Sequence, residues 1–205
     1  MGRIIGSNIA GAVGNLVFYS YNGNNYVRIA PGKRSKKSWS EKQRQNWKRF
    51  RALTDFWMQF NNTQIEQIWK VAEEGKRGHN LFISANSPAF GADGTLIDRE
   101  WLHFSAGKLP LPHRLTANLV PGDPEKVEVT WQTDEGNMLA DSDDELMMMV
   151  SNDDKFIGPI KTGAKRKQES AVVQLPAGIG TINGIYLFFG SDTRKLYSVD
   201  MWFGI

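Results

Sequence analysis

The sequence contains no cysteine among its 205 residues. This absence excludes a disulfide framework, a cysteine-based zinc site and a thiol nucleophile. A chain without thiols suits a reducing cytoplasm, although a protein secreted without disulfides has the same composition.

Histidine is scarce as well, with only His79, His103 and His113 in the whole chain. None of the three forms a His-x-His or His-x-x-x-His pair of the kind that binds metal ions, and no Gly-x-Ser-x-Gly motif accompanies them. The sequence therefore predicts a protein that is not an enzyme, with no catalytic residue, no cofactor and no dedicated metal site.

Long hydrophobic runs are also missing, so we expect no transmembrane segment and no membrane partner. The stretch Met1–Asn8 has one basic residue followed by glycine and asparagine instead of a long apolar core. This pattern is not that of a signal peptide, and we expect none.

Acidic residues cluster at one place, Asp141-Ser142-Asp143-Asp144-Glu145. Clustered carboxylates suit calcium, but the run lacks the glycine and the final glutamate of an EF-hand loop. We interpret it as an acidic loop that enters a strand, and whether it binds a cation stays open at this point.

Charge of opposite sign is separated along the chain. Up to Arg51 there are eleven Lys or Arg and one acidic residue, a net charge of +10, whereas the rest of the chain has fourteen bases and twenty-one acids, a net charge of −7. Such segregation indicates a basic partner-binding surface or head-to-tail self-association.

The segment 33–51 has the highest density of bases, nine against one acid. The candidate partner-binding or nucleic-acid-binding residues within it are Lys33, Arg34, Lys36, Lys37, Arg44, Lys48 and Arg51. Interleaved aromatic residues are typical of phosphate-contacting surfaces. However, Trp47 and Phe50 recur with the apolar residues of a helix, so we expect them in the core, and a solvated basic face is the simpler interpretation.

The first part of the chain predicts a β-hairpin followed by two or three helices. Asn22-Gly23-Asn24 supplies the positive φ angles of a tight turn between Leu16–Tyr21 and Asn25–Ile29. Ser40 with Gln43, and Thr63 with Glu66, have the spacing of capping boxes, and a third short helix is expected at Asn80–Asn86. A lone hairpin with apolar residues on both faces needs a partner.

After Pro112 the pattern changes to short strands separated by Gly, Pro, Asn and Asp. We expect strands at Arg114–Leu119, Lys126–Gln132, Glu145–Asn152, Phe156–Lys161, Ser170–Leu175, Ile182–Gly190 and Leu196–Phe203. Seven such strands predict an immunoglobulin- or fibronectin-like antiparallel β-sandwich with Trp131 in its core. For Met147-Met148-Met149 we expect one face in the core and the other in a contact surface, because successive strand residues face opposite sides.

The predicted class is therefore α+β, with a hairpin-plus-helical basic domain over residues 1–89, a linker region over 90–112 and a sandwich over 113–205. The linker assignment depends on Leu109-Pro110-Leu111-Pro112, which has the composition of an interdomain connection.

Several motifs together resemble a known family. They are Gly14-Asn15-Leu16-Val17, Tyr26-Val27-Arg28, Gln43-Arg44, Phe50, Trp69, Gly78-His79-Asn80-Leu81-Phe82, Trp131, Ala140-Asp141 and Tyr197-Ser198. The pattern is similar to a family of uncharacterised proteins of about two hundred residues, close to the 205 residues of this chain, which is common in Bacteroidota and resembles proteins from phage structural regions. Many of those relatives have Asn-Pro before the first helix, where this chain has Lys37-Ser38-Trp39.

The resemblance carries packing and turn residues, and implies a non-enzymatic, virion-associated protein. The leading hypothesis is thus a structural or interaction subunit of a larger assembly, most of all a phage or phage-like virion, located in the virion or the cytoplasm. Its partners would be other structural proteins or copies of itself in a homo-oligomer. The alternative is a nucleic-acid-binding protein that uses the segment 33–51.

Overall fold

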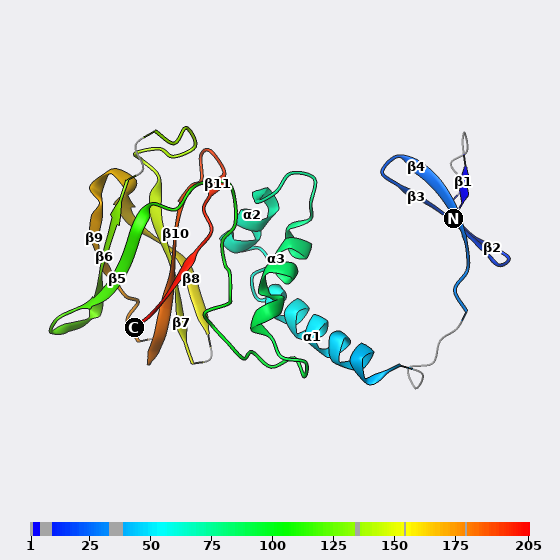
Figure 1. Cartoon of the computed structure of the whole chain (residues 1–205), viewed down its shortest axis with the longest axis horizontal. Coiled ribbons are helices and arrows are strands. Elements are labelled where there is room, and N and C mark those ends of the chain that lie inside the picture. Colours follow the sequence, from blue (N-terminus) through cyan, green and yellow to red (C-terminus); the bar gives the residue numbers. More distant parts are fainter. Residues whose placement is uncertain (1, 5–9, 33–38, 134–135, 154, 179) are drawn as a thin grey trace. The chain divides into compact units, whose positions relative to one another are not determined.

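The computed structural model describes residues 2–4, 10–32, 39–133, 136–153, 155–178 and 180–205. Contacts divide the chain into two compact units, Met1–Glu41 and Lys42–Ile205. Figure 1 shows the elements of both units along the chain, and each unit is described by itself below.

The first unit, Met1–Glu41, contains a four-stranded antiparallel sheet in the order β1-β4-β3-β2. Its strands are β1 (Gly2–Ile4), β2 (Gly11–Val13), β3 (Leu16–Tyr21) and β4 (Asn24–Ile29). The turn between β3 and β4 has positive φ angles at Asn22 (48°) and Gly23 (74°), so the predicted hairpin is confirmed. Strands β1 and β2, which extend the hairpin on either side, were not predicted from the sequence.

The second unit begins with three helices, α1 (Glu41–Met58), α2 (Gln64–Val71) and α3 (Gly78–Asn86). The predicted helix starts are confirmed for α1 and α2. At the start of α2 the expected capping box does not form, because the Thr63 hydroxyl donates to the Phe60 carbonyl (2.6 Å) and Glu66 accepts from the Asn62 N–H (2.7 Å) instead of the Thr63 N–H. Gly78 fits against α2, since a Cβ there would lie 2.7 Å from the Trp69 carbonyl carbon.

Two antiparallel sheets follow the helices. One consists of β5 (His113–Val120), β6 (Asp123–Gln132) and β9 (Ser170–Gln174), in the order β5-β6-β9. The other has the order β11-β10-β7-β8, from β7 (Glu145–Asn152), β8 (Phe156–Lys165), β10 (Ile182–Ser191) and β11 (Leu196–Tyr197), and β12 (Met201–Gly204) also pairs with β10. The single strand predicted at Leu196–Phe203 is therefore two strands.

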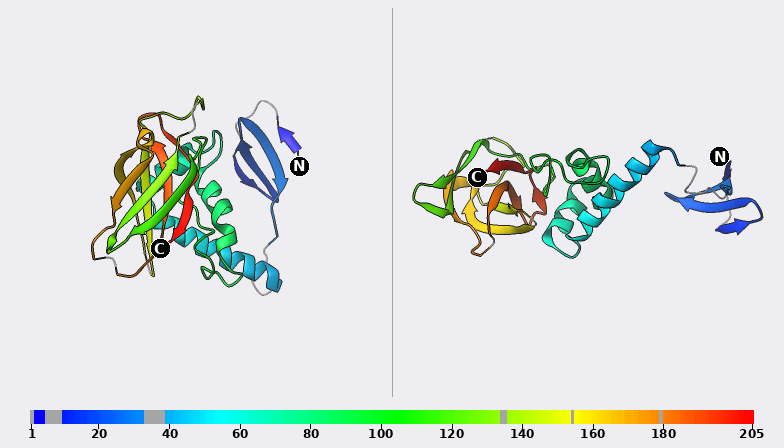
Figure 2. Two further views of the ribbon diagram at one scale, coloured as in Figure 1. Left: turned by 60° about the vertical axis from the view of Figure 1, so that its left-hand side comes forward. Right: turned by 90° about the horizontal axis from the view of Figure 1, so that it is seen from below.

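Within this unit, the sheet that contains β7 and β10 is covered on both faces. Figure 1 shows the three helices on one side of it and β5, β6 and β9 on the other, and the view from below in Figure 2 agrees. Two separate hydrophobic clusters result. The cluster on the helical side includes Trp57, Phe82, Met147, Met149, Tyr186 and Phe188, and the cluster between the sheets includes Val127, Trp131, Met148, Val150, Leu187 and Phe189.

The three consecutive methionines show how this arrangement follows from strand alternation. Met147 and Met149 face the helices, Met148 faces the second sheet, and all three are buried. The expectation that one face of this strand forms a contact surface is thus wrong, because the helices cover that face. Trp131 is buried as predicted, and its ring Nε1 donates to the Arg166 carbonyl (2.7 Å).

The division into units differs from the predicted domain boundaries. Contacts divide the chain after Glu41, and helices α1–α3 share a core with β7 and β10. The segment predicted as a linker, 90–112, supplies Phe90, Leu102, Phe104 and Leu109 to the buried cores. Its Pro- and Leu-rich composition indicated a connection between domains, but these apolar residues pack inward.

The fold class is α+β with antiparallel sheets, as predicted from the sequence. An N-terminal hairpin, helices and then C-terminal sheets occur in the expected order. The immunoglobulin- or fibronectin-like topology of the C-terminal sheets stays a prediction.

Candidate interaction surface

Helix α1 is packed along only part of its length. Every residue from Glu41 to Ala52 is exposed or half-buried, and burial begins at Leu53, followed by Phe56 and Trp57. An α-helix turns about 100° per residue, so Trp47, six residues before Leu53, lies about 120° around the helix from it. Most side chains of the first three turns of α1 are therefore exposed, and Gln45, Arg49 and Ala52 are half-buried.

A tight loop contacts the helix near the end of this exposed part, at Lys48 and Ala52. Gly94 has a φ of +90°, and a Cβ at this position would lie 3.1 Å from both the Ala52 Cβ and the Lys48 carbonyl oxygen. Only glycine allows this approach in this backbone conformation. The loop is itself ordered by Asp93, whose carboxylate accepts from the backbone N–H (3.0 Å) and hydroxyl (2.7 Å) of Thr95, and these bonds hold the pKa of Asp93 below its ordinary value.

A second contact comes from the helix to the same loop. The Arg49 Nε donates to the Gly91 carbonyl oxygen (3.3 Å). Arg49 is half-buried, which separates it from the other bases of α1. It supports the helix and is not part of the exposed basic side.

The exposed side of α1 combines aromatic and basic residues. Trp47 is 43% exposed and Phe50 is 52% exposed, which are large fractions for such apolar side chains. The Arg51 guanidinium carbon lies 5.5 Å from the centroid of the Trp47 ring, and Arg51 also pairs with Asp55 (3.8 Å). This arrangement overturns the expectation that Trp47 and Phe50 belong to the core.

The structure brings together three of the predicted site residues. Arg44, Lys48 and Arg51 are all exposed and are spaced four and three residues apart, so they share one side of the helix. Lys33, Arg34, Lys36 and Lys37 lie outside the described residues. We call the set Arg44, Trp47, Lys48, Phe50 and Arg51 the α1 surface.

A shallow hollow of about 540 Å³ borders the C-terminal half of the helix. Its lining combines apolar groups with polar ones, among them Asp55, Gln59, Arg99 and Asp153. Arg99 is held in place by the carbonyl oxygen of Asp153 (2.6 Å) and the hydroxyl of Ser151 (3.2 Å). Apolar, polar and charged side chains therefore lie together beside the α1 surface.

Carboxylates of the acidic run 141–145 form ion pairs with basic residues of the same chain. Asp144 is buried, pairs with the buried Arg166 (3.6 Å) and is also hydrogen-bonded by Arg194. Asp144 further accepts from the Asp141 N–H (2.8 Å), which closes the loop on itself. The guanidinium of Arg166 also lies over the Phe189 ring, 4.9 Å from its centroid.

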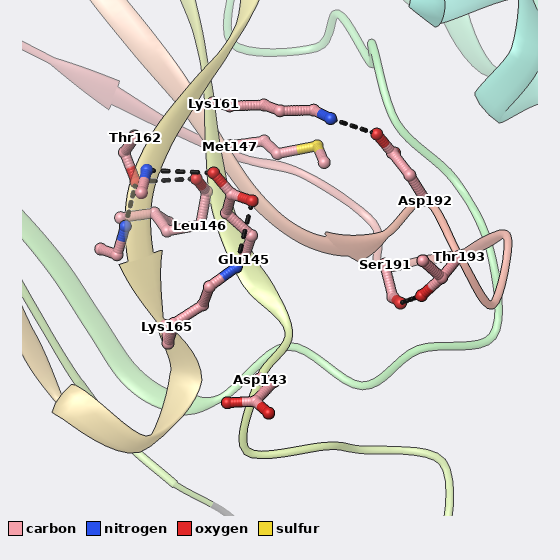
Figure 3. Close-up of polar contacts among 12 residues, drawn as sticks. Asp143, Glu145, Leu146, Met147, Lys161, Thr162, Lys165, Ser191, Asp192 and Thr193 are labelled. Carbon is pink, nitrogen blue, oxygen red and sulfur yellow. Dashed lines mark hydrogen bonds and ion pairs between the residues drawn. The ribbon is translucent and has the colours of Figure 1, made fainter.

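The neighbouring carboxylates are paired in the same way. Asp143 bonds with Lys167 (2.8 Å), which lowers the pKa of Asp143, and Glu145 pairs with Lys165 (3.2 Å). The second pair is drawn in Figure 3. Among the residues that the structure describes, no group of three potential ligands comes together that could hold a metal ion. The run is thus explained as a charge-compensated loop that enters β7.

A second polar cluster joins α2 to the end of the β7–β10 sheet. Asp192 accepts from Gln64 (2.9 Å) and Tyr197 (2.7 Å) and pairs with Lys161, a pair visible in Figure 3. Although burial acts to raise it, these bonds hold the pKa of Asp192 below its ordinary value. Burial and the bond to Asp192 raise the pKa of the Tyr197 hydroxyl. Two hollows of about 450 and 380 Å³ are lined in part by Tyr197. The Tyr197 hydroxyl beside them donates its hydrogen bond to Asp192.

The third cluster contains one of the histidines. His103 Nδ1 lies 2.8 Å from the carboxylate of Asp200, whose other oxygen accepts from the Phe104 N–H (2.6 Å). The hydrogen bond with Asp200 raises the pKa of His103, and burial opposes this rise. Asn86 bonds both the N–H and the carbonyl oxygen of His103 (2.8 and 3.0 Å). These bonds attach the segment 90–112 to α3 and to the start of β12.

Sequence reasoning missed these three clusters, because their partners lie far apart in the chain. His103 and Asp200 are 97 residues apart, and Asp144 and Arg194 are 50 apart. For Trp47, a signal was present in the sequence. Leu53, Phe56, Trp57 and Phe60 alone complete an apolar helical stripe, and Trp47 lies away from it.

Comparisons of the chain with protein-family models, curated proteins and solved structures found no match. In the described part of the chain, no helix is long and apolar enough to cross a membrane.

Proposed function

We propose that this protein is a non-enzymatic structural or interaction subunit of a larger assembly, and that it docks on another protein through the α1 surface. The observation that carries the proposal is the exposure of two neighbouring aromatic residues, Trp47 and Phe50, beside three bases on helix α1. Apolar side chains that are exposed next to one another and bordered by polar residues are typical of interaction sites.

The composition of the α1 surface favours a protein partner. Protein interfaces are enriched in aromatic residues and arginine, and the residues that dominate binding energy are most often Trp, Tyr and Arg. The contact of Arg51 with the Trp47 ring presents both groups together. Met58, which is also exposed, continues the apolar character toward the end of the helix.

A basic surface needs an acidic partner surface, and the structure narrows where that surface can lie. Asp143, Asp144 and Glu145 are already paired with bases of their own chain. The acidic loop of a neighbouring copy is therefore a poor partner, since docking there would have to displace these pairs. We infer that the α1 surface meets acidic residues other than those of this loop.

The resemblance of the sequence pattern to a family from phage structural regions suggests the kind of assembly. On that basis we propose a phage or phage-like virion. The resemblance supports only this context, and the α1 surface supports the interaction role independently of it.

The second candidate is nucleic-acid binding, which the exposure of Trp47 now favours more than the sequence did. An exposed indole beside Arg44, Lys48 and Arg51 could stack on a base while the cations contact phosphates. The affinity would then fall with salt, with a log–log slope of about −3 for three phosphate contacts or about −6 for all seven predicted bases on duplex DNA.

A mobility-shift titration with duplex and single-stranded DNA at several salt concentrations separates the two functions. The test uses the full chain, the double variant Arg44→Glu/Lys48→Glu, and a matched control, Lys108→Glu/Lys195→Glu, at two exposed lysines elsewhere. The proposal expects weak binding that the two double variants reduce alike. Tight, salt-sensitive binding that only the Arg44→Glu/Lys48→Glu variant loses would establish nucleic-acid binding instead.

A further inference from the structure

The sheet of the first unit has two faces of different chemistry. In an antiparallel sheet, residues directly opposite each other lie on the same face. The register pairs Val13 with Leu16, Leu16 with Ile29, and Phe18 with Val27. Together with Gly11, Ser20 and Asn25, these residues form one face without a charged side chain, which we call the uncharged face.

The opposite face is polar and aromatic. Tyr19 stacks on Tyr26, with ring centroids 5.5 Å apart, and the Arg28 guanidinium lies over the Tyr19 ring at 5.8 Å. Ala12, Val17, Tyr21 and Asn24 complete this side. Arg28, the basic residue of β4, therefore lies on this polar and aromatic face. The uncharged face has only apolar and small neutral residues.

The uncharged face is open within its own unit. Val13 is 63% exposed and Ile29 is 71% exposed, and every residue over 10–32 is exposed or half-buried. The unit spans only residues 1–41 and has no cysteine to form a disulfide. Chains of this size usually need disulfides, metal ions or association with another chain to hold a sheet together.

We propose that the uncharged face is the interface through which two copies of this protein associate. A face without charge is complementary to itself, because a two-fold axis places apolar residues against apolar residues and buries no unpaired charge. Two such sheets would pack about 10 Å apart, with their strands inclined by about 30°. The proposed dimer interface has no residue in common with the α1 surface, so an experiment can disprove one of the two proposals without disproving the other.

The size of the face sets the expected strength. Strands β3 and β4 have six residues each and β1 and β2 have three each, so the sheet has a footprint of about 300 Å² per copy. Such a footprint is well below the about 800 Å² per partner that stable specific interfaces bury, so the expected association is weak. Dimerisation therefore depends on concentration and is reinforced when copies are held close together in an assembly.

The first test is sedimentation velocity of the full chain over a range of concentrations. The mass should rise from that of one 23.1 kDa chain toward that of two. Ile29→Lys should abolish this rise. Tyr21→Lys, which places the same charge at a residue of similar exposure (66%) on the opposite face, should leave it unchanged. A chain that is monomeric at all concentrations, or a dimer that Ile29→Lys does not weaken, overturns the proposal.

The second test does not depend on how the sheet tolerates a lysine. Because the chain has no cysteine, a single introduced thiol reacts alone. Val27→Cys lies on the uncharged face and Tyr26→Cys on the other, and a thiol-specific cross-linker about 10 Å long matches the spacing of packed sheets. Val27→Cys should give cross-linked dimers and Tyr26→Cys should stay monomeric. Equal cross-linking of the two variants would contradict a face-to-face dimer.

Discussion

The guanidinium of Arg51 lies over the ring of Trp47, 5.5 Å from its centroid, on a part of helix α1 where both side chains are exposed. A cation over an indole face is stabilised by about 0.5–1 kcal/mol at exposed sites, and by more once water is excluded. The pair therefore presents a flat aromatic surface and a fixed charge together, and a partner that covers the pair strengthens it.

Replacing Trp47 should separate binding from folding. Trp47→Ala removes an exposed side chain, so we expect the free energy of unfolding to change by less than about 1 kcal/mol. Trp57→Ala, on the same helix but buried, should cost about 3–5 kcal/mol. Urea denaturation of the two variants measures the difference. Equal destabilisation would mean that Trp47 is packed in solution.

The buried charge cluster should be essential for stability. Asp144→Asn leaves Arg166 and Arg194 without their carboxylate, and an uncompensated buried arginine costs about 3–5 kcal/mol. Asp143→Asn, at an exposed pair with Lys167, should cost less than about 1 kcal/mol.

Thermal unfolding with calcium or with a chelator should give the same midpoint for the unmodified chain. Clear stabilisation by calcium would show that the loop binds a cation after all.

The pair of His103 and Asp200 should make stability depend on pH. The hydrogen bond with Asp200 raises the pKa of His103, so the folded state binds the proton more tightly than the unfolded state. The resulting stability is fully present below the ordinary histidine pKa of about 6.5 and is lost as the pH rises through the raised value.

His103→Gln should remove this part of the pH dependence, whereas His79→Gln, at a histidine that lies beside the Trp57 ring, should retain it. Urea midpoints measured between about pH 5.5 and 8.5 follow the change. A profile of the His103→Gln variant that is parallel to that of the unmodified chain would show that the pair is not formed.

The helices and the sheets should fold only together. A fragment of residues 113–205 would expose Met147, Met149, Tyr186 and Phe188, which the helices cover in the full chain. We expect this fragment to aggregate, and the fragment 42–205 to unfold in one cooperative transition followed by circular dichroism. A soluble, cooperatively folded fragment 113–205 would support the domain boundary predicted from the sequence.

How far the sequence predicts this fold depends on how local each signal is. The turn at Asn22-Gly23 and the buried strand at Trp131 were predicted because turn residues and strand alternation can be recognised within a few consecutive residues. The role of residues 90–112 could not be predicted in this way. Phe104 is buried because it contacts α2, β10 and Asp200, which are far from it in the sequence. A local sequence pattern does not predict such contacts.

The candidate site was predicted in part. The concentration of bases indicated the right helix, but Trp47 and Phe50 were assigned to the core because they continue an aromatic run at nearly helical spacing. Burial is decided by what packs against a helix, and the covering elements reach α1 only near Lys48 and beyond. The helix sequence predicts the apolar stripe from Leu53 onward, but it does not show how far along the helix the covering elements reach.

The most direct test of the proposed role is the distribution of the protein between free and particle-bound forms in the cells from which it comes. Tagged copies of the unmodified chain, of Arg44→Glu/Lys48→Glu and of the control Lys108→Glu/Lys195→Glu are separated on a density gradient. The unmodified chain and the control should sediment with large particles, and the Arg44→Glu/Lys48→Glu variant should stay with free protein. An unmodified chain found only in the free fractions, or a variant that enters particles as well as the control does, would contradict an assembly role for the α1 surface.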